Sequence, residues 1–292
     1  MERTRIALEK ARQQRLAAQG RPVAPQRPTG EGLAGDRLGS DGRPVTVAPL
    51  PVEVPKPTEI RYHQTQVLRP DPGDLRENRV IAGFIDAEAA DLYRMLRAQV
   101  LQRLTARKLS TLAVCSAKDG EGKTLVAANL AVSLALDVNQ TVLLVDLDFR
   151  RPGLHKRFGL RPERGLNDYL LGDVDLTACL INPGIERLVI LPTCAPIAGS
   201  SETLSSPKMA GLAHELKHRY PDRIVIYDLP PLLMTDDCLV FLQHVDACLL
   251  VVEDGATRKI DIERSVDHLS HFNLIGTVLN KAPKTDMRSY YA

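Results

Sequence analysis

Residues 115–124, with the sequence CSAKDGEGKT, constrain the fold of this chain more than any other segment. The glycines allow backbone N–H groups to turn inward around phosphate groups. The segment follows the apolar run 111–114 and precedes the helix-like residues 125–132. This is the strand–loop–helix context that a phosphate-binding loop requires. We therefore predict a nucleotide-binding loop that opens a helix, with the positive end of the helix facing the anion.

Individual positions of this loop have distinct predicted roles. Lys123 would bring its charge to the β- and γ-phosphates, and the Thr124 hydroxyl would bind Mg²⁺. Ala117 stands where the usual pattern has glycine, a change that requires only a residue without bulk. The predicted nucleotide-binding residues of the loop are Ala117, Lys118, Asp119, Gly120, Glu121, Gly122, Lys123, Thr124 and Leu125.

The composition excludes some functions. Apolar residues make up 44% of the chain and charged residues 25%, as in ordinary globular proteins. Aromatic residues are only 4%, without tryptophan, which argues against a base-stacking surface, so we expect no nucleic-acid partner. The five cysteines lack the spacing of metal ligands, and most lie in apolar surroundings. This is typical of free thiols in a reducing cytoplasm.

Positive charge is concentrated at the N-terminus. The net charge of the chain is +2, but residues 1–30 carry seven Lys or Arg and two Glu, which leaves the remainder at −3. Residues 1–20 are predicted to form a basic helix that is either solvated or docked on a partner or an acidic membrane surface. No apolar run approaches the ~20 residues of a membrane span. No secretory signal is evident, so we expect a cytoplasmic protein.

Three further segments follow this helix. Residues 21–82 are rich in proline and glycine and are predicted to be a disordered linker, residues 83–285 a P-loop domain, and residues 286–292 a tail with two tyrosines. The expected strands are 111–116, 141–146, 187–192, 223–228, 247–252 and 274–279. The expected helices are 87–107, 123–137, 207–219, 236–244 and 258–271. Because strands alternate with helices and are apolar throughout, we predict an α/β fold with a doubly wound, mostly parallel sheet.

Three carboxylates follow two of these strands. Asp146 and Asp148 end the apolar run 142–145, and Asp228 ends the run 224–227. The carboxyl ends of parallel strands meet at the edge where ligands bind in open α/β sheets, so we expect these groups beside the loop. Asn280 follows another strand-like run and is a candidate contact to a nucleotide base.

These motifs together resemble the bacterial tyrosine kinases of capsule and exopolysaccharide synthesis, relatives of the MinD/ParA-type ATPases. The resemblance covers roughly residues 85–285. It rests on the segments SAKDGEGKT, AANLA, VLLVDLDFRRPGLHKRFGL, RYPDRIVIYDLPPLLMTDD and GTVLNKA. The second acidic motif, Asp-x-Asp-x-Arg-Arg-Pro, is its most specific part.

The resemblance implies roles for the acidic residues. Lys123, Asp146 and Asp148 would be catalytic, with Asp146 helping to deprotonate the incoming phenol. Thr124, Asp146 and Asp228 would bind the metal. ATP and Mg²⁺ are the implied substrate and cofactor.

The resemblance also implies assembly. Asp91, Arg94 and Arg97 stand where the family has a helical Glu-x-x-Arg-x-x-Arg that joins subunits, with the shorter aspartate in place of glutamate. The tail bears Tyr290 and Tyr291, the implied autophosphorylation sites, whereas family tails usually carry a larger cluster. Implied partners are a second copy of the chain, a membrane chain-length-determinant (Wzz-like) protein that activates and recruits the kinase to the inner membrane, and a phosphotyrosine phosphatase.

Two functional hypotheses remain open on the sequence. The first is a protein-tyrosine autokinase that regulates exopolysaccharide synthesis and chain length by phosphorylating the tail of a neighbouring subunit. The second is a MinD/ParA-like ATPase switch that assembles on a membrane partner without kinase activity. Lys118 bears on the choice, because such ATPases hold a lysine there that reaches the nucleotide of a partner subunit. An exposed loop lysine is the alternative.

Overall fold

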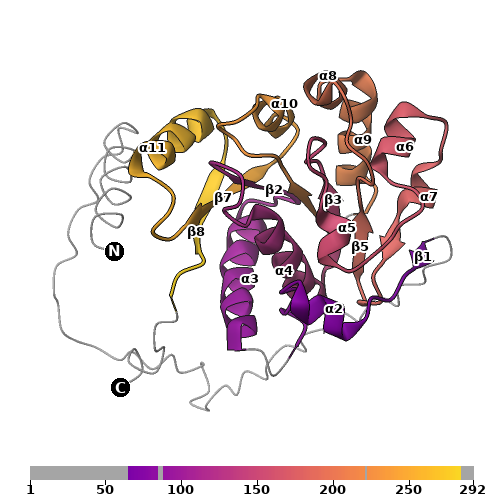
Figure 1. The fold of residues 1–292 in the computed structure, drawn as a ribbon, viewed down its shortest axis with the longest axis horizontal. Helices are drawn as coiled ribbons and strands as arrows, with labels where there is room; N and C mark the ends of the chain where they lie inside the picture. Colours follow the sequence, from indigo (N-terminus) through magenta and orange to yellow (C-terminus); the bar gives the residue numbers. More distant parts are fainter. Residues whose placement is uncertain (1–64, 85–87, 221, 284–292) are drawn as a thin grey trace, which may run out of the picture. The chain divides into compact units, whose positions relative to one another are not determined.

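The strands form one mixed sheet in the order β1-β4-β5-β3-β6-β2-β7-β8 (Figure 1). The computed structural model describes residues 65–84, 88–220 and 222–283. Within them the strands are β1 (Gln66–Val67), β2 (Thr111–Ser116), β3 (Thr141–Asp146), β4 (Ile181–Asn182), β5 (Leu188–Leu191), β6 (Arg223–Asp228), β7 (Ala247–Glu253) and β8 (Leu274–Asn280). All neighbouring pairs are parallel except β4–β5, which is antiparallel. The predicted fold class is confirmed.

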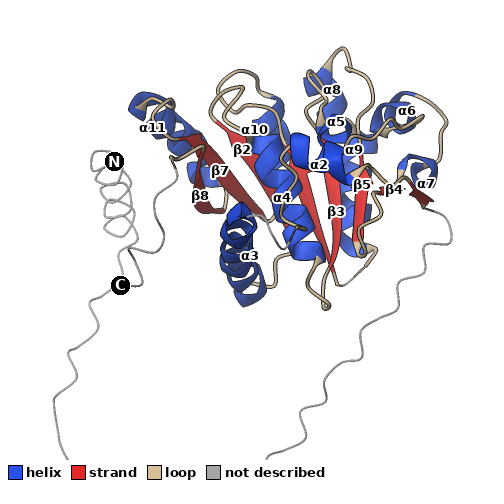
Figure 2. Cartoon of the chain, turned by 60° about the horizontal axis from the view of Figure 1, so that its bottom comes forward, coloured by secondary structure: helices blue, strands red, loops and turns tan. Residues whose placement is uncertain are grey.

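Helices cover both faces of the sheet (Figure 2). One face packs against α2 (Pro72–Glu77), α3 (Glu88–Ala106), α4 (Lys123–Ala135) and α5 (Leu154–Arg157). The other packs against α6 (Leu166–Leu171), α7 (Leu176–Cys179), α8 (Ser200–Leu204), α9 (Pro207–His218), α10 (Asp237–Leu242) and α11 (Lys259–His268), which continues into the 3₁₀ turn Leu269–His271. The six strands and five helices expected from the sequence are all present, with ends shifted by at most three residues.

The central strands are apolar throughout because each face of the sheet has its own core. In β2, Leu112 and Val114 belong to the core beneath α4, whereas Ala113 and Cys115 belong to the core of the opposite face. This is the alternation that a strand imposes on its side chains. The cysteines are free thiols, all buried except the half-buried Cys194, as the composition predicted.

The predicted linker boundary at residue 82 is wrong. Residues 66–82 contribute β1, which pairs in parallel with β4, and α2. Val80 and Ala82 are fully buried in the core beneath α4. Proline and glycine in this stretch suggested a linker, but its order comes from contacts with distant residues rather than from local periodicity. The predicted helix 1–20 and the tail 286–292 lie outside the described residues.

Asn129 is the residue that joins this segment to α4. Its side-chain oxygen accepts hydrogen bonds from the backbone N–H groups of Ile81 and Ala82, at 2.8 and 2.9 Å. Its amide nitrogen donates to the carbonyl oxygens of Arg79 and Leu125, at 2.9 and 3.0 Å. The buried amide is therefore fully used, and the segment before α3 is fixed to the helix that follows the P-loop.

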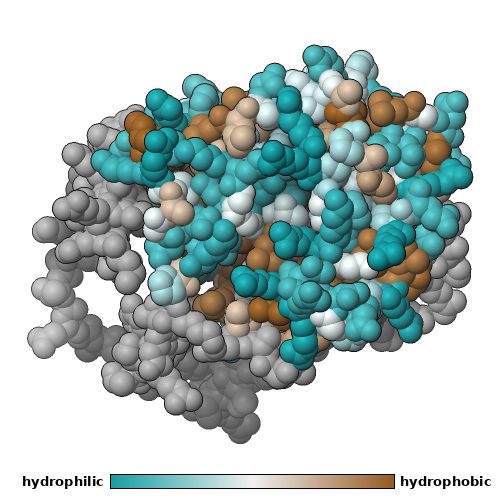
Figure 3. All heavy atoms as spheres, in the orientation of Figure 1, coloured by the Kyte–Doolittle hydropathy of each residue, from teal (hydrophilic) through white to brown (hydrophobic). Residues whose placement is uncertain are grey.

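The helix α3 leaves part of its apolar surface uncovered. Val100 and Leu104 are buried, but Leu92 and Met95 of the same helix are 52% and 50% exposed. Figure 3 shows apolar side chains over the region of α3, and further groups of them toward α6 and α8 on the same face. The inward side of α3 packs on α4, where Arg97 donates to the carbonyl oxygen of Ser133 at 2.8 Å.

We expect Asn129→Ala to lower the free energy of unfolding by about 2–4 kcal/mol, because it leaves several buried backbone groups without partners. Urea denaturation would measure the change. The control is Asn139→Ala, at an exposed position after α4, which should change stability by no more than about 0.5 kcal/mol. Equal stability of the two variants would contradict the proposed anchoring role of Asn129.

Candidate active site

The sheet order brings the predicted acidic residues beside the loop. β6 lies between β2 and β3, and its last residue, Asp228, is in register with Asp146 of β3 and with Val114 of β2. The loop leaves β2 at this edge and enters α4 at Lys123. The residues that sequence analysis took from three separate motifs therefore converge at the carboxyl end of three adjacent strands.

Two glycines give the loop its shape. Gly120 and Gly122 have φ angles of +85° and +93°, the left-handed region that side chains disfavour. A Cβ atom on Gly122 would lie 2.1 Å from the Nδ2 atom of Asn280. Glycine at this position is thus required both by backbone conformation and by the close approach of β8.

Glu121, between these glycines, holds the loop in place. Its carboxylate accepts hydrogen bonds from the Lys118 backbone N–H at 3.1 Å and from the Thr257 hydroxyl at 2.7 Å. Its backbone carbonyl accepts from the Asn280 amide at 2.9 Å. Asn280 therefore supports the loop backbone, a contact not expected from the sequence, and its role in base recognition stays a prediction.

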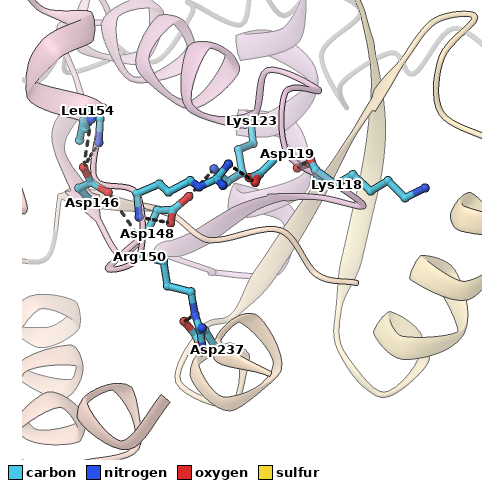
Figure 4. Close-up of polar contacts among 11 residues, drawn as sticks. Lys118, Asp119, Lys123, Asp146, Asp148, Arg150, Leu154 and Asp237 are labelled. Atoms are coloured by element: carbon cyan, nitrogen blue, oxygen red, sulfur yellow. Dashed lines mark hydrogen bonds and ion pairs between the residues drawn. The ribbon is translucent and has the colours of Figure 1, made fainter. Parts of the chain in front are cut away.

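Lys123 lies between carboxylates. Its ammonium group donates to Asp148 Oδ2 at 2.7 Å, and both side chains are buried (Figure 4). Burial alone would lower the pKa of Lys123, but the negative charges of Asp228 and Asp148 outweigh it and raise the pKa. The lysine is therefore charged and positioned to exchange one anionic partner for a phosphate.

Asp146 is completely buried and faces the start of α5. Its Oδ2 atom accepts hydrogen bonds from the N–H groups of Gly153 and Leu154, at 3.1 and 3.0 Å, and its Oδ1 atom accepts one from Asp148 N–H at 3.2 Å. Burial, and then the neighbouring Asp228 charge, raise the pKa of Asp146 to about 8. This carboxylate is consequently a stronger base than an exposed aspartate.

Asp228 is the carboxylate with the least support from the protein. Both of its oxygens are buried without a hydrogen-bond partner of good geometry among the described residues. Burial raises its pKa to about 6, against the lowering effects of the Lys123 charge and the nearby Thr124 hydroxyl. Buried anionic oxygens without partners are costly, and oxygen ligands of this kind suit Mg²⁺.

The side chains at this site supply only part of the ligand shell of a metal ion. Within the described part of the chain, no three His, Cys, Asp or Glu side chains form a complete metal cage. Mg²⁺ in phosphoryl-transfer sites commonly takes one or two carboxylates, with water and substrate phosphates completing its shell. Asp228 and Thr124, with Asp146 and Asp148 close by, fit that arrangement.

The two arginines of the acidic motif bind carboxylates of neighbouring segments. Arg150 forms two hydrogen bonds to Asp237 of α10, at 3.0 and 3.1 Å (Figure 4). Arg151 pairs with Asp119 of the loop at 2.7 Å. Ser200 also donates to Asp237. The sequence carries no local signal for the contact between Arg150 and Asp237, because the two residues lie 87 positions apart.

Lys118 is engaged within its own subunit. Its ammonium group donates to Asp261 of α11 at 2.7 Å, and Arg258 forms two further bonds to the same carboxylate. Arg258 and Lys118 hold the pKa of Asp261 well below its usual range. Figure 4 shows the Lys118 side chain extending away from Lys123 and Asp148. Thr257 and Asp261 had no recognisable signal in the sequence.

The predicted oligomerisation residues lie apart from this site. Asp91 and Arg94 form an ion pair with each other on α3, and Arg97 contacts α4. Tyr290 and Tyr291 lie outside the described residues.

Comparison with known proteins places this geometry in a family. Residues 112–291 match the CobQ/CobB/MinD/ParA nucleotide binding domain. The tyrosine-protein kinase YwqD of Bacillus subtilis is 31% identical over 230 residues, covering 77% of this chain and 95% of that protein. The chain belongs to this nucleotide-binding family, among its bacterial tyrosine kinases.

Other relatives agree with this assignment. The putative tyrosine-protein kinase CapB of Staphylococcus aureus is 28% identical over 69% of this chain and 88% of its own length. Among solved structures, the chimerical protein CapA2B2 is 26% identical with a TM-score of 0.65, covering 75% of this chain and 94% of that one. The kinase domain of Escherichia coli ETK is 27% identical with a TM-score of 0.62, covering 70% and 82%.

Membership in this family leaves attachment to a membrane as a separate question. Among residues 65–84, 88–220 and 222–283, no helix combines the length and apolar character needed to cross a membrane.

Asp228→Asn provides a test of the buried charge. Because the folded-state pKa of Asp228, about 6, exceeds the ordinary 3.8, its ionisation destabilises the fold. The cost is absent below about pH 4, where the carboxyl is protonated in both states, and is complete above about pH 6. The nucleotide-free variant should therefore be more stable than the wild type by about 1–3 kcal/mol at pH 8, with no gain near pH 4.

Urea denaturation at several pH values measures this difference. A gain that did not change with pH would show that packing, not the charge, distinguishes the two proteins. The matched variant Asp119→Asn removes a more exposed carboxylate at the same edge and should show no comparable gain with rising pH.

Proposed function

We propose that this chain transfers the γ-phosphoryl group of Mg-ATP to tyrosine side chains, with Tyr290 and Tyr291 of a neighbouring subunit as its own acceptors. The observation that carries the proposal is the charged Lys123 held between Asp148 and the unpartnered Asp228 at the mouth of the P-loop. This arrangement is unsatisfied until an anion and a cation enter together, as Mg-ATP would.

The residues divide the work of the transfer. The backbone of residues 117–125 and the Lys123 ammonium group would hold the phosphates, with Lys123 exchanging Asp148 for a phosphate oxygen. Thr124 and Asp228, supported by Asp146, would hold Mg²⁺, which neutralises charge on the phosphates. Arg151 and Asp119 would keep the second acidic motif against the loop.

Transfer of the phosphoryl group to a tyrosine requires removal of the proton from its phenol group. As the phenol oxygen bonds to the γ-phosphorus, the bond from that phosphorus to the bridging oxygen breaks, ADP leaves, and the phenol proton passes to a carboxylate. An unmodified tyrosine, with a pKa of about 10, is a poor nucleophile without such a base. Asp146, with its pKa raised to about 8, is the proposed acceptor at Oδ1, which receives a single backbone hydrogen bond.

Delivery of a neighbour's tail implies a homo-oligomer. We place its interface on α3, where Leu92 and Met95 are half exposed beside the Asp91–Arg94 pair. The pair keeps the aspartate and arginine in contact although the aspartate is shorter than the family's glutamate. Arg97 anchors this surface to α4, so assembly and the helix that follows the P-loop are mechanically connected.

We further propose a membrane chain-length-determinant protein as activator and anchor, a regulatory role in exopolysaccharide synthesis, and a cognate phosphotyrosine phosphatase. The relatives support this placement, since one of them is the succinoglycan biosynthesis transport protein ExoP of Rhizobium meliloti, 30% identical over 74% of this chain. The basic segment 1–20 is the candidate contact to the partner.

The geometry of Lys118 disfavours the ATPase-switch alternative. A lysine that crossed to a partner's nucleotide would have to give up Asp261, a carboxylate it shares with Arg258. We therefore expect Lys118→Ala to leave ATP-dependent assembly unchanged, as measured by sedimentation with and without Mg-ATP. Loss of assembly would favour the switch.

Kinase activity can be tested directly on the tail. Incubation of the full chain with Mg-ATP and host membranes should place phosphate on Tyr290 or Tyr291, as measured by intact mass and phosphopeptide analysis. Lys123→Met should reduce this at least ~100-fold, because the charge that stabilises the transferring group is lost. Steady ATP consumption with an unmodified tail would refute the kinase proposal.

Assembly through α3 has its own test. The double variant Leu92→Asp/Met95→Asp should shift the sedimentation of the Mg-ATP form to smaller species, because buried interfaces exclude unpaired charge. Leu171→Asp, at an apolar position of α6 that is 66% exposed, is the matched control and should sediment like the wild type. Identical sedimentation of all three proteins would place the interface elsewhere.

A further inference from the structure

A pocket that is separate from the candidate active site lies beside the phosphate-binding loop, on the side to which Lys118 points. It has a volume of about 680 Å³ and is formed by the segment after β6 and by α11, outside the Lys123–Asp148 cluster. Leu232, Leu233 and Leu239 supply an apolar wall. The pocket thus offers a surface for a flat apolar group, bordered by charge.

The border of this pocket is mainly basic. Lys118, Arg258, Arg264 and His268 line it, together with Asp236 and Asp261. Asp261 is already neutralised by the two cations it binds, and Arg264 makes no ion pair with any described residue. Arg264 is therefore a guanidinium group available to an anion.

The pocket wall also holds a hydroxyl without a partner. Thr235 Oγ1 is buried and makes no hydrogen bond within the described residues. Because this oxygen is buried and not open to the pocket, the chemistry of the ligand is set by the apolar wall and the Arg264 guanidinium group, which together match an aromatic ring that carries a phosphate. The chemistry of the pocket thus points to phosphotyrosine.

The chain itself contains a segment of matching chemistry within reach. Residues 284–292 follow β8, where Lys281 pairs with Glu253 at 2.9 Å, and Glu253 begins the loop that leads through Thr257 to Arg258. Seven residues, from 284 to 290, extend up to about 23–25 Å. The strand that precedes the tail is therefore joined, through the ion pair of Lys281 with Glu253, to the loop that leads to Arg258 at the pocket border.

The net charge of residues 284–292 determines whether this segment would be attracted to the basic border of the pocket. Residues 284–292 carry Lys284, Arg288 and Asp286, a net charge of +1, which gives no attraction to a basic border. Each phosphotyrosine adds about −1.5 to −2. The doubly phosphorylated segment would therefore be about −2 to −3 and complementary to the pocket.

We propose that the pocket beside α11 binds the phosphorylated tail of the same subunit, with Arg264 contacting the phosphate. The proposal rests on the proposed kinase function, since it concerns the product of that reaction. A docked tail is withdrawn from the neighbour's active site and shielded from a phosphatase, so the modified subunit stays modified.

The first test uses a fluorescent synthetic peptide of residues 282–292, with or without phosphate on both tyrosines. It is titrated into the full chain carrying Tyr290→Phe and Tyr291→Phe, so that no native tail competes. The phosphorylated peptide should bind at least about tenfold more tightly. Arg264→Ala should remove most of that difference. Lys259→Ala, on the same helix but paired with Glu263 and outside the pocket, should retain it.

Several results would overturn the proposal. Equal binding of both peptides, or full binding by Arg264→Ala, would exclude recognition of phosphate at this pocket. Displacement of the peptide by inorganic phosphate at similar concentration would show a general anion site instead. Because the peptide is phosphorylated synthetically, none of these outcomes depends on the kinase activity of the chain.

The second test asks whether the docking occurs within one subunit. The phosphorylated full chain should lose phosphate to a phosphatase several-fold more slowly than phosphorylated Arg264→Ala, at a rate unaffected by dilution. Protection that disappeared on dilution would assign the pocket to a second copy of the chain and refute docking within one subunit. Arg264→Ala that failed to phosphorylate itself would instead place Arg264 in the kinase reaction and would also refute the proposal.

Discussion

The interaction on which the active site depends is the burial of Lys123 among three carboxylates. Asp146, Asp148 and Asp228 are each at most 3% exposed, so three ionisable carboxyl groups are buried around one lysine. Burial of like charges raises carboxylate pKa values, as it does for Asp146 and Asp228. The edge of the sheet therefore carries buried carboxyl groups whose ionisation a bound cation would favour.

The phosphate loop is shaped as much by the C-terminal third of the domain as by its own glycines. Thr257 holds the Glu121 carboxylate, Asp261 holds Lys118, and Asn280 holds the Glu121 carbonyl. All three partners come from the region between β7 and the start of the tail. The loop is therefore directly connected to α11 and to the end of β8, from which residues 284–292 follow.

The α3 surface proposed for assembly and the candidate active site both contact α4. The helix begins at Lys123, carries Asn129 that fixes the segment before α3, and near its end accepts Arg97 through the Ser133 carbonyl. A surface on α3 is therefore connected to the active site through one rigid element. This gives a physical route by which contact with another subunit would influence the site.

The sequence by itself determined the parallel α/β fold, the P-loop and the three carboxylates, because long apolar strands and a contiguous loop leave a local pattern. The long-range partners of Lys118, Glu121 and Arg150 were decided only by the tertiary structure, since they lie 87 to 159 residues away. The structure of residues 66–82 likewise left no local pattern, because it comes from pairing with β4 and from hydrogen bonds to Asn129. Local periodicity reveals which segments are buried, whereas hydrogen bonds between distant segments exist only once the sheet order has brought them together.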